Sequence, residues 1–297
     1  MRTTLAALSL LLVMVSSAAA TIVTKAIEYT HNGVKLEGYY AYDDAVTGPR
    51  PGMIVVHEWW GQNKFARDQA EELAKLGYAA FAVDMYGKGV TAGKAEDAQK
   101  LAAPFYADRK LMRERVAAGL KILLDQKEVV AAAGQLQQVG AIGFCFGGTV
   151  ALELARAGAA TLPAGAEFKA LVTFHAGLSS VKGGEAKKGD FKPAVLVCHG
   201  ADDPMVTDAE VKAFQEEMKA AGVDLQFNSY SGTVHAFTNP DADAFKIPGV
   251  KYNKVSAKLA KASMRSFLAH HLPSQSVPDM IKPATAQPKP DGTETKK

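Results

Sequence analysis

The sequence predicts an α/β fold with a mostly parallel central sheet, helices on both faces of the sheet and an N-terminal antiparallel hairpin. Short continuous apolar runs, typical of strands buried on both faces, recur along the chain, and helical patterns follow most of them. Before these runs, an Asn-Gly pair separates two segments that read as strands, which is a strong hairpin signal. Of the 297 residues, 48% are hydrophobic and 22% are charged, as in an ordinary globular protein.

The hairpin is the first expected element, with strands at residues 22–29 and 34–40 joined through His31-Asn32-Gly33. The later strands are expected at residues 53–56, 79–83, 139–142, 170–174, 195–198 and 224–230. The helices are expected at residues 65–76, 109–125, 149–156, 208–221 and 253–270. These elements form one domain, residues 21–272.

Both ends of the chain differ from this domain. Residues 1–20 contain Arg2, an apolar run and then Ala18-Ala19-Ala20, the pattern of a signal peptide cleaved before Thr21. Residues 273–297 contain five prolines and no hydrophobic period, so we expect a disordered tail. No later apolar stretch reaches the ~20 residues that a membrane helix needs. The sequence predicts an exported protein, periplasmic or secreted, that is free of the membrane after signal cleavage.

Charge and ligand spacing exclude several function classes. The net charge of +3 is partly carried by the chain ends, and nucleic-acid binding gets no support from it. No paired His or Cys residues have metal-ligand spacing. We expect a monomer that binds a small molecule and uses no metal or cofactor.

The segment Gly143-Phe144-Cys145-Phe146-Gly147 lies between a predicted strand and a predicted helix. It resembles the sharp turn that exposes the nucleophile of an α/β-hydrolase fold, with cysteine in the usual serine position. Glycines belong there because the strand and the helix approach closely beside a strained residue. The helix N-terminus favours a thiolate, and the N–H of Phe146 is a candidate oxyanion donor. The alternative is a glycine-rich connection with an incidental buried cysteine.

Cys198 is the only other cysteine, and an exported chain would ordinarily join it to Cys145 in a disulfide. Each cysteine, however, ends a different predicted strand, and the turn gives Cys145 another role. We therefore expect two free thiols.

A cysteine nucleophile in this fold needs a carboxylate and a histidine, in the chain order nucleophile, acid, base. Asp203 lies in the turn after the strand 195–198, three residues beyond Gly200, whereas Asp202 is interpreted as a solvated turn residue. Of seven histidines, only His235 lies between the last strand and the last helix. These positions predict Asp203 as the orienting acid and His235 as the base.

The strand 53–56 ends in His57-Glu58-Trp59-Trp60-Gly61, at a sheet edge that the fold places beside the nucleophile. This loop usually supplies a second oxyanion donor, here the N–H of Trp59. A carboxylate at this position is unusual, so Glu58 is a candidate for helping to activate the thiol. The alternative is a solvated loop carboxylate.

Together, Glu58 in His-Glu-Trp-Trp-Gly, Cys145 in Gly-Phe-Cys-Phe-Gly-Gly, Asp203 in Gly-Ala-Asp-Asp-Pro and His235 in His-Ala-Phe resemble the dienelactone hydrolase family. The resemblance spans most of residues 21–271. It implies a carboxymethylenebutenolidase-like hydrolase in which Cys145 attacks an ester or lactone carbonyl and Asp203 orients His235. It also implies that substrate binding displaces Glu58, which then helps to form the thiolate.

The sequence departs from this family where its dienelactone-specific members carry two arginines that grip the substrate carboxylate. Lys88 and Asn239 stand at these positions, and a lysine is a point charge that cannot reproduce bidentate recognition. We expect Trp60, Tyr86, Lys88 and Phe237 to contact a substrate that is less charged than dienelactone.

Two other functions stay open at this stage. One is a non-catalytic exported binding protein on the same fold. The other is an acyltransferase or peptidase.

Overall fold

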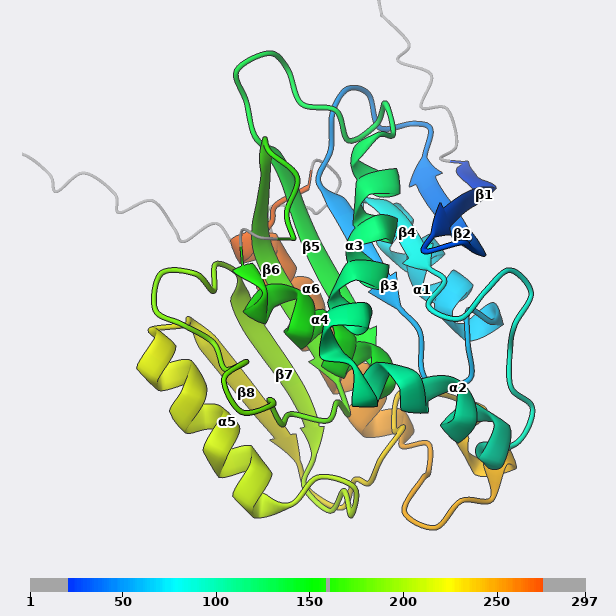
Figure 1. Cartoon of the computed structure of the whole chain (residues 1–297), viewed down its shortest axis with the longest axis vertical. Coiled ribbons are helices and arrows are strands. Elements are labelled where there is room, and N and C mark those ends of the chain that lie inside the picture. The colour runs from blue at the N-terminus through cyan, green and yellow to red at the C-terminus, as the bar shows by residue number, and fades with distance from the viewer. Residues whose placement is uncertain (1–20, 159–160, 275–297) are drawn as a thin grey trace, which may run out of the picture.

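The computed structural model describes residues 21–158 and 161–274, and an eight-stranded sheet forms the centre of this part (Figure 1). The strand order is β1-β2-β4-β3-β5-β6-β7-β8. The pairs β1–β2 and β2–β4 are antiparallel, and all other neighbours are parallel. This confirms the predicted fold class. The expected signal peptide, residues 1–20, and residues 275–297 of the expected tail lie outside the described residues.

The strands are β1 Ile22–His31, β2 Val34–Asp43, β3 Gly52–Val56, β4 Ala79–Val83, β5 Gln137–Phe144, β6 Ala166–Phe174, β7 Ala194–Gly200 and β8 Leu225–Tyr230. The helices are α1 Lys64–Lys75, α2 Ala95–Ala107, α3 Arg109–Leu124, α4 Phe146–Arg156, α5 Asp208–Ala221 and α6 Lys254–His271, with a short 3₁₀ turn, η2, at Ala242–Phe245.

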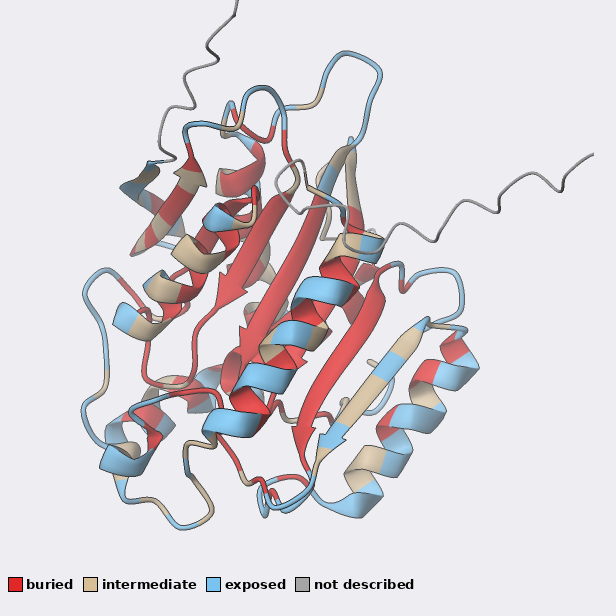
Figure 2. Cartoon of the chain, turned by 180° about the vertical axis from the view of Figure 1, so that it is seen from behind, coloured by how far each residue is buried: buried red, intermediate tan, exposed pale blue. Residues whose placement is uncertain are grey.

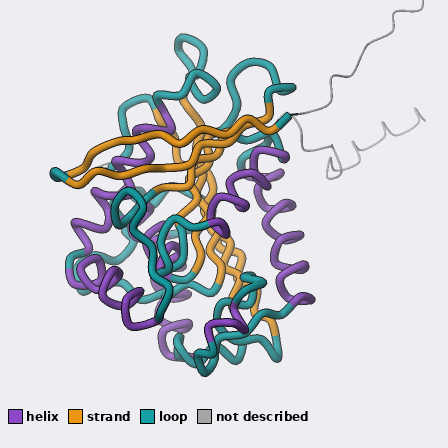
Figure 3. Tube along the Cα trace, turned by 90° about the vertical axis from the view of Figure 1, so that its right-hand side faces the viewer, coloured by secondary structure: helices purple, strands orange, loops and turns teal. Residues whose placement is uncertain are grey.

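The predicted hairpin and its turn are confirmed. Asn32 and Gly33 have φ angles of 50° and 76°, and two positive φ angles are what a two-residue hairpin turn of type I′ requires. The pairing runs from Ile22 opposite Asp43 to His31 opposite Val34. In Figure 3, the two hairpin strands form the edge of the sheet that faces the viewer and run at a wide angle to the strands behind them, as the accumulated twist of a sheet produces.

The sheet separates two hydrophobic layers. Helices α2, α3, α4 and α5 contribute to the core on one face, and α1 and α6 contribute to the core on the other. Figure 2, which shows the second face, shows α1 and α6 lying over strands that are coloured as buried almost throughout. Burial on both faces explains why these strands appear in the sequence as continuous apolar runs.

Helix α2 was not predicted, because Pro104 lies inside it and no side chain caps its N-terminus at Lys94. Proline removes one helical N–H donor and lowers helix propensity. The helix forms where Ala98, Ala102 and Phe105 are buried against the rest of the fold. Tertiary packing therefore outweighs a local sequence that disfavours the helix.

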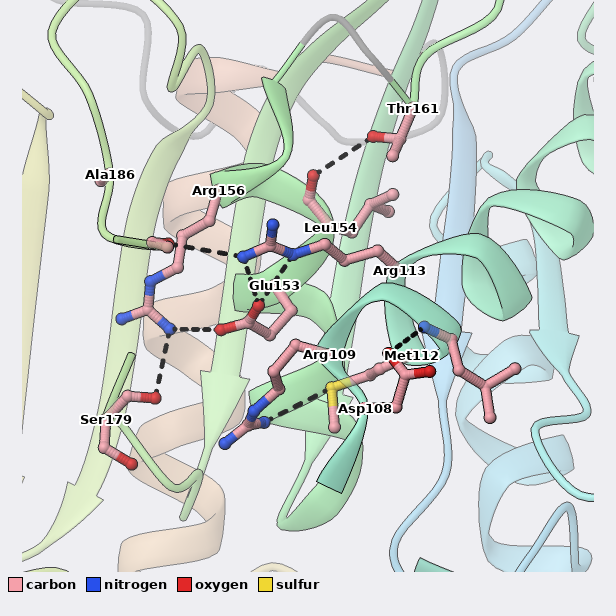
Figure 4. A network of polar contacts seen from close by, with 12 residues as sticks. Asp108, Arg109, Met112, Arg113, Glu153, Leu154, Arg156, Thr161, Ser179 and Ala186 are labelled. Carbon is pink, nitrogen blue, oxygen red and sulfur yellow. Dashed lines mark hydrogen bonds and ion pairs between the residues drawn. The ribbon is translucent and has the colours of Figure 1, made fainter. Parts of the chain in front are cut away.

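A buried ion network holds α4, the helix that begins directly after Cys145. Glu153 accepts a hydrogen bond of 2.9 Å from Arg113 of α3 and one of 3.2 Å from Arg156 (Figure 4). Arg156 also donates to Glu217 of α5 and, at 2.9 Å, to the carbonyl of Leu178. The network thus fastens α4 to α3, to α5 and to the segment after β6.

We expect Glu153→Gln to lower the free energy of unfolding by about 3 kcal/mol, because it leaves the Arg113 guanidinium without its buried counter-ion. Urea unfolding followed by circular dichroism measures the change. The matched control is Glu216→Gln on α5, which removes an exposed partner of Lys212 and should cost less than about 1 kcal/mol. Equal losses in the two variants would contradict this account of the network.

Candidate active site

Cys145 lies in a strained turn between β5 and α4, with φ 52° and ψ −119°. A positive φ at a non-glycine residue persists only where the surroundings enforce it. Here the neighbouring glycines allow the backbone to pack closely. A Cβ atom at Gly143 would lie 2.2 Å from the Gly147 carbonyl oxygen, and one at Gly147 would lie 2.2 Å from the Val56 carbonyl oxygen. The expected sharp turn is present, and its glycines are sterically required.

The thiol of Cys145 is free, and so is that of Cys198, which is fully buried in the second core layer. Cys145 is partly exposed and lines a pocket. Phe146 occupies the first position of α4, where backbone N–H groups have no partner within the helix. The turn therefore directs a thiol and a donor-rich helix end toward the same space.

Asp203 and His235 come together from two loops at the same sheet edge. Nδ1 of His235 lies 2.8 Å from Oδ2 of Asp203, and Oδ1 of Asp203 accepts a hydrogen bond from the N–H of Met205 at 2.9 Å. Both side chains are buried, whereas Asp202 is exposed. The structure thus places Asp203, and not Asp202, where it can orient the imidazole.

His235 is held through Nδ1 of its ring and along its backbone, whereas its Nε2 is buried without a hydrogen-bond partner. Its N–H donates to the Gly249 carbonyl at 3.0 Å, and its carbonyl accepts from Lys251 at 3.1 Å. Burial alone would lower the pKa of His235. The negative charge of a Cys145 thiolate and the hydrogen bond with Asp203 outweigh burial and raise this pKa to about 10. An imidazolium is therefore stable beside a Cys145 thiolate.

Glu58 is only 3% exposed, so it is not a solvated loop carboxylate. Its Oε2 accepts a hydrogen bond of 2.6 Å from Nδ2 of Asn239, while its Oε1 is buried without a partner. Burial raises the pKa of Glu58 to about 7, and the Asn239 hydrogen bond and the charge of His235 oppose that rise. Glu58 is thus a carboxyl group that changes its charge near neutral pH.

A pocket of about 480 Å³ opens above these groups. Cys145, His235 and Glu58 line it together with Trp59 and Trp60. The other lining residues are Gln99, Ala102, Ala103, Tyr106, Gly177, Met205, Val206, Ala236, Phe245, Ile247 and Val250. This lining is mostly apolar and includes no lysine or arginine.

Much of this wall was not predicted from the sequence. Ala102 and Tyr106 come from α2, whose existence the sequence obscured. Phe245 belongs to η2, and its ring centre lies 4.2 Å from that of Trp60. A helical spacing of small residues, with Ala98 and Ala102 four apart, was the available signal for α2.

Three residues expected to contact the substrate lie outside the pocket lining. Lys88 pairs with Glu28 and, at 3.2 Å, with Glu37, which face each other directly across β1 and β2. Like charges opposite each other in a sheet repel, so a cation is stabilised there instead of in the pocket.

The other two residues lie deeper in the structure. Phe237 is fully buried, with its ring centre 5.4 Å from that of His175. Tyr86 donates a hydrogen bond of 3.1 Å to the Trp59 carbonyl and so supports the loop that carries Glu58. Both residues shape the site indirectly.

Within residues 21–158 and 161–274, no group of three or more His, Cys, Asp or Glu side chains is arranged to hold a metal ion. Nor does any helix there combine the length and apolar character that crossing a bilayer requires.

Glu58→Gln should make stability less dependent on pH. A buried carboxyl whose pKa rises from 4.5 to about 7 stabilises the fold fully below pH 4.5, and this contribution is lost as pH rises through 7. The wild type should therefore lose about 2 to 3 kcal/mol more than the variant between pH 5 and pH 8. Urea unfolding of both proteins at the two pH values measures this difference, and parallel losses would contradict the assigned charge change.

The chain is similar to several known proteins and to one family model. A model of the dienelactone hydrolase family matches residues 36–272. A protein named usf from Aquifex pyrophilus is 30% identical over 216 residues, which are 72% of this chain and 86% of the relative. A putative carboxymethylenebutenolidase from Aquifex aeolicus is 29% identical over 217 residues, with the same two shares.

Among solved structures, P91, a dienelactone hydrolase-like promiscuous phosphotriesterase from metagenomic libraries, is 37% identical with a TM-score of 0.73. The match covers 82% of this chain and 95% of P91. Since the family model spans most of the described residues, the chain belongs to the dienelactone hydrolase family of carboxylic ester hydrolases.

Proposed function

We propose that this enzyme hydrolyses neutral carboxylic esters or lactones, with Cys145 as the nucleophile. The observation that carries the proposal is the convergence of a strained cysteine and a histidine on one pocket, with a carboxylate paired to the histidine. The histidine pairs with Asp203 at 2.8 Å and is stable as an imidazolium beside a thiolate. This is the arrangement that nucleophilic catalysis by cysteine requires.

In the first half of the reaction, the Cys145 thiolate attacks the carbonyl carbon and forms a C–S bond. The N–H groups of Phe146 and Trp59 are our candidates for holding the resulting oxyanion. When the intermediate collapses, the C–O bond breaks and the His235 imidazolium gives its proton to the departing alcohol. In a lactone, this alcohol stays tethered to the acyl group.

In the second half, His235 takes a proton from water and the hydroxyl attacks the thioester. The C–S bond breaks, the carboxylic acid leaves and the thiolate returns to its pair with the imidazolium. Asp203 holds His235 in the tautomer and orientation that both halves need.

The substrate class follows from the lining of the pocket. No lysine or arginine lines it. By the resemblance described above, Asn239 stands at one of the two positions where a family member specific for dienelactone has a carboxylate-gripping arginine. Burying an unpaired carboxylate in such a pocket would be costly. A neutral ester with apolar groups fits the wall formed by Trp59, Tyr106 and Ile247.

A second candidate activity is the hydrolysis of activated neutral phosphotriesters. The similarity to P91, which is described as a promiscuous phosphotriesterase, favours it. The Cys145 thiolate would attack phosphorus and expel an aryloxide, and water would then cleave the S–P bond.

Export to the periplasm or medium stays a prediction from residues 1–20. N-terminal sequencing of the mature protein tests whether this segment is removed.

Cys145→Ala should lower kcat/KM for a neutral p-nitrophenyl ester at least about 10³-fold, because the covalent path is lost. The matched control is Cys198→Ala, which removes the buried free thiol outside the pocket and should retain activity.

In the same assay with the wild type, an ester with a carboxylate on its acyl chain should react more slowly than its neutral counterpart of equal length.

Unchanged turnover in Cys145→Ala would overturn the proposed nucleophile. Tight ester binding without turnover in the wild type would instead indicate a binding protein. Transfer of the acyl group to amines in preference to water would indicate an acyltransferase.

A further inference from the structure

Asn239 connects the two loops that carry Glu58 and His235. It lies four residues after His235, it is 1% exposed, and its Nδ2 donates to Oε2 of Glu58 across 181 positions of sequence. Its own backbone is fixed, since its N–H donates to the Ala236 carbonyl at 3.0 Å and its carbonyl accepts from Ala242 at 3.1 Å. Asn239 is therefore a rigid support for the carboxyl group.

The orientation of the Asn239 amide follows from its second hydrogen bond. Its Oδ1 accepts the N–H of Asp241 at 2.9 Å, so the NH₂ group must face Glu58. The amide can donate to the carboxyl but cannot accept a proton from it. Glu58 Oε1, which has no partner, is then the only oxygen of this carboxyl that is free to take up a proton.

Glu58 and Cys145 can each carry a negative charge, and few groups in the pocket can compensate it. The groups that face Glu58 are His235, Asp241 and the neutral side chain of Asn239. Cys145 lines the same pocket. The His235 imidazolium, which already pairs with Asp203, is the single cation among the residues that line this pocket. A second buried anion would be uncompensated and costly.

We propose that Asn239 is a positioning residue: its neutral hydrogen bond holds Glu58 at the pocket and favours the carboxylate form of Glu58 without adding a charge to the site. This rests on the function proposed above. Because Asn239 brings no cation, Glu58 can still take up a proton at Oε1, which has no hydrogen-bond partner.

The test follows the protonation of Glu58 in Asn239→Leu, which removes the donor, and in Asn239→Asp, which keeps the shape. Both changes disfavour the carboxylate form of Glu58. In the pH profile of kcat/KM, the limb due to Glu58 is identified by its disappearance in Glu58→Gln. This limb should move to higher pH by roughly one unit in both Asn239 variants. In the Glu58→Gln background, neither change should alter the shape of the profile. This distinguishes positioning from a general structural effect.

An unmoved limb, or equal effects of Asn239→Leu with and without Glu58→Gln, would overturn the proposal. A second readout does not depend on activity: the infrared band of the protonated carboxyl, assigned by its loss in Glu58→Gln, should titrate at higher pH in Asn239→Asp. A shifted band in a protein without esterase activity would overturn the proposed function and leave the role of Asn239 intact. An unshifted band would overturn the role of Asn239.

Discussion

The site depends on the close approach of three backbone segments around Cys145. Strand β5, the start of α4 and the end of β3 meet where Gly143 and Gly147 have no side chains, and a methyl group at either would collide with backbone. This contact forces the turn that holds Cys145 at φ 52°. Because Glu58 comes two residues after β3, the same contact also brings a carboxylate to the nucleophile.

Charge balance is the second constraint on the chemistry. Two groups that can carry negative charge, Glu58 and Cys145, line one pocket with a single imidazole and no lysine or arginine. Buried charges of like sign cannot all be compensated by one cation. The pocket therefore suits neutral substrates, and a neutral amide at Asn239 leaves the carboxyl able to change its charge.

Much of the fold was predictable because its signals are local. The hairpin follows from Asn32-Gly33, and the buried strands follow from apolar runs whose position in the sheet the structure confirms. The glycine spacing around Cys145 and the strand-end positions of Asp203 and His235 also carry their own geometry. Local patterns failed where packing decides the outcome. Helix α2 forms despite Pro104, and Lys88 is drawn to Glu28 and Glu37 by a strand register that the sequence does not reveal.

The central claim is that Cys145 carries the acyl group during turnover. Acid quenching of the reaction with a slowly deacylating aryl ester, followed by peptide mass spectrometry, tests it directly. One acyl group on the peptide that contains Cys145, and none on the peptide that contains Cys198, is the predicted result. Turnover with no covalent adduct, or with the adduct on another residue, would contradict the account.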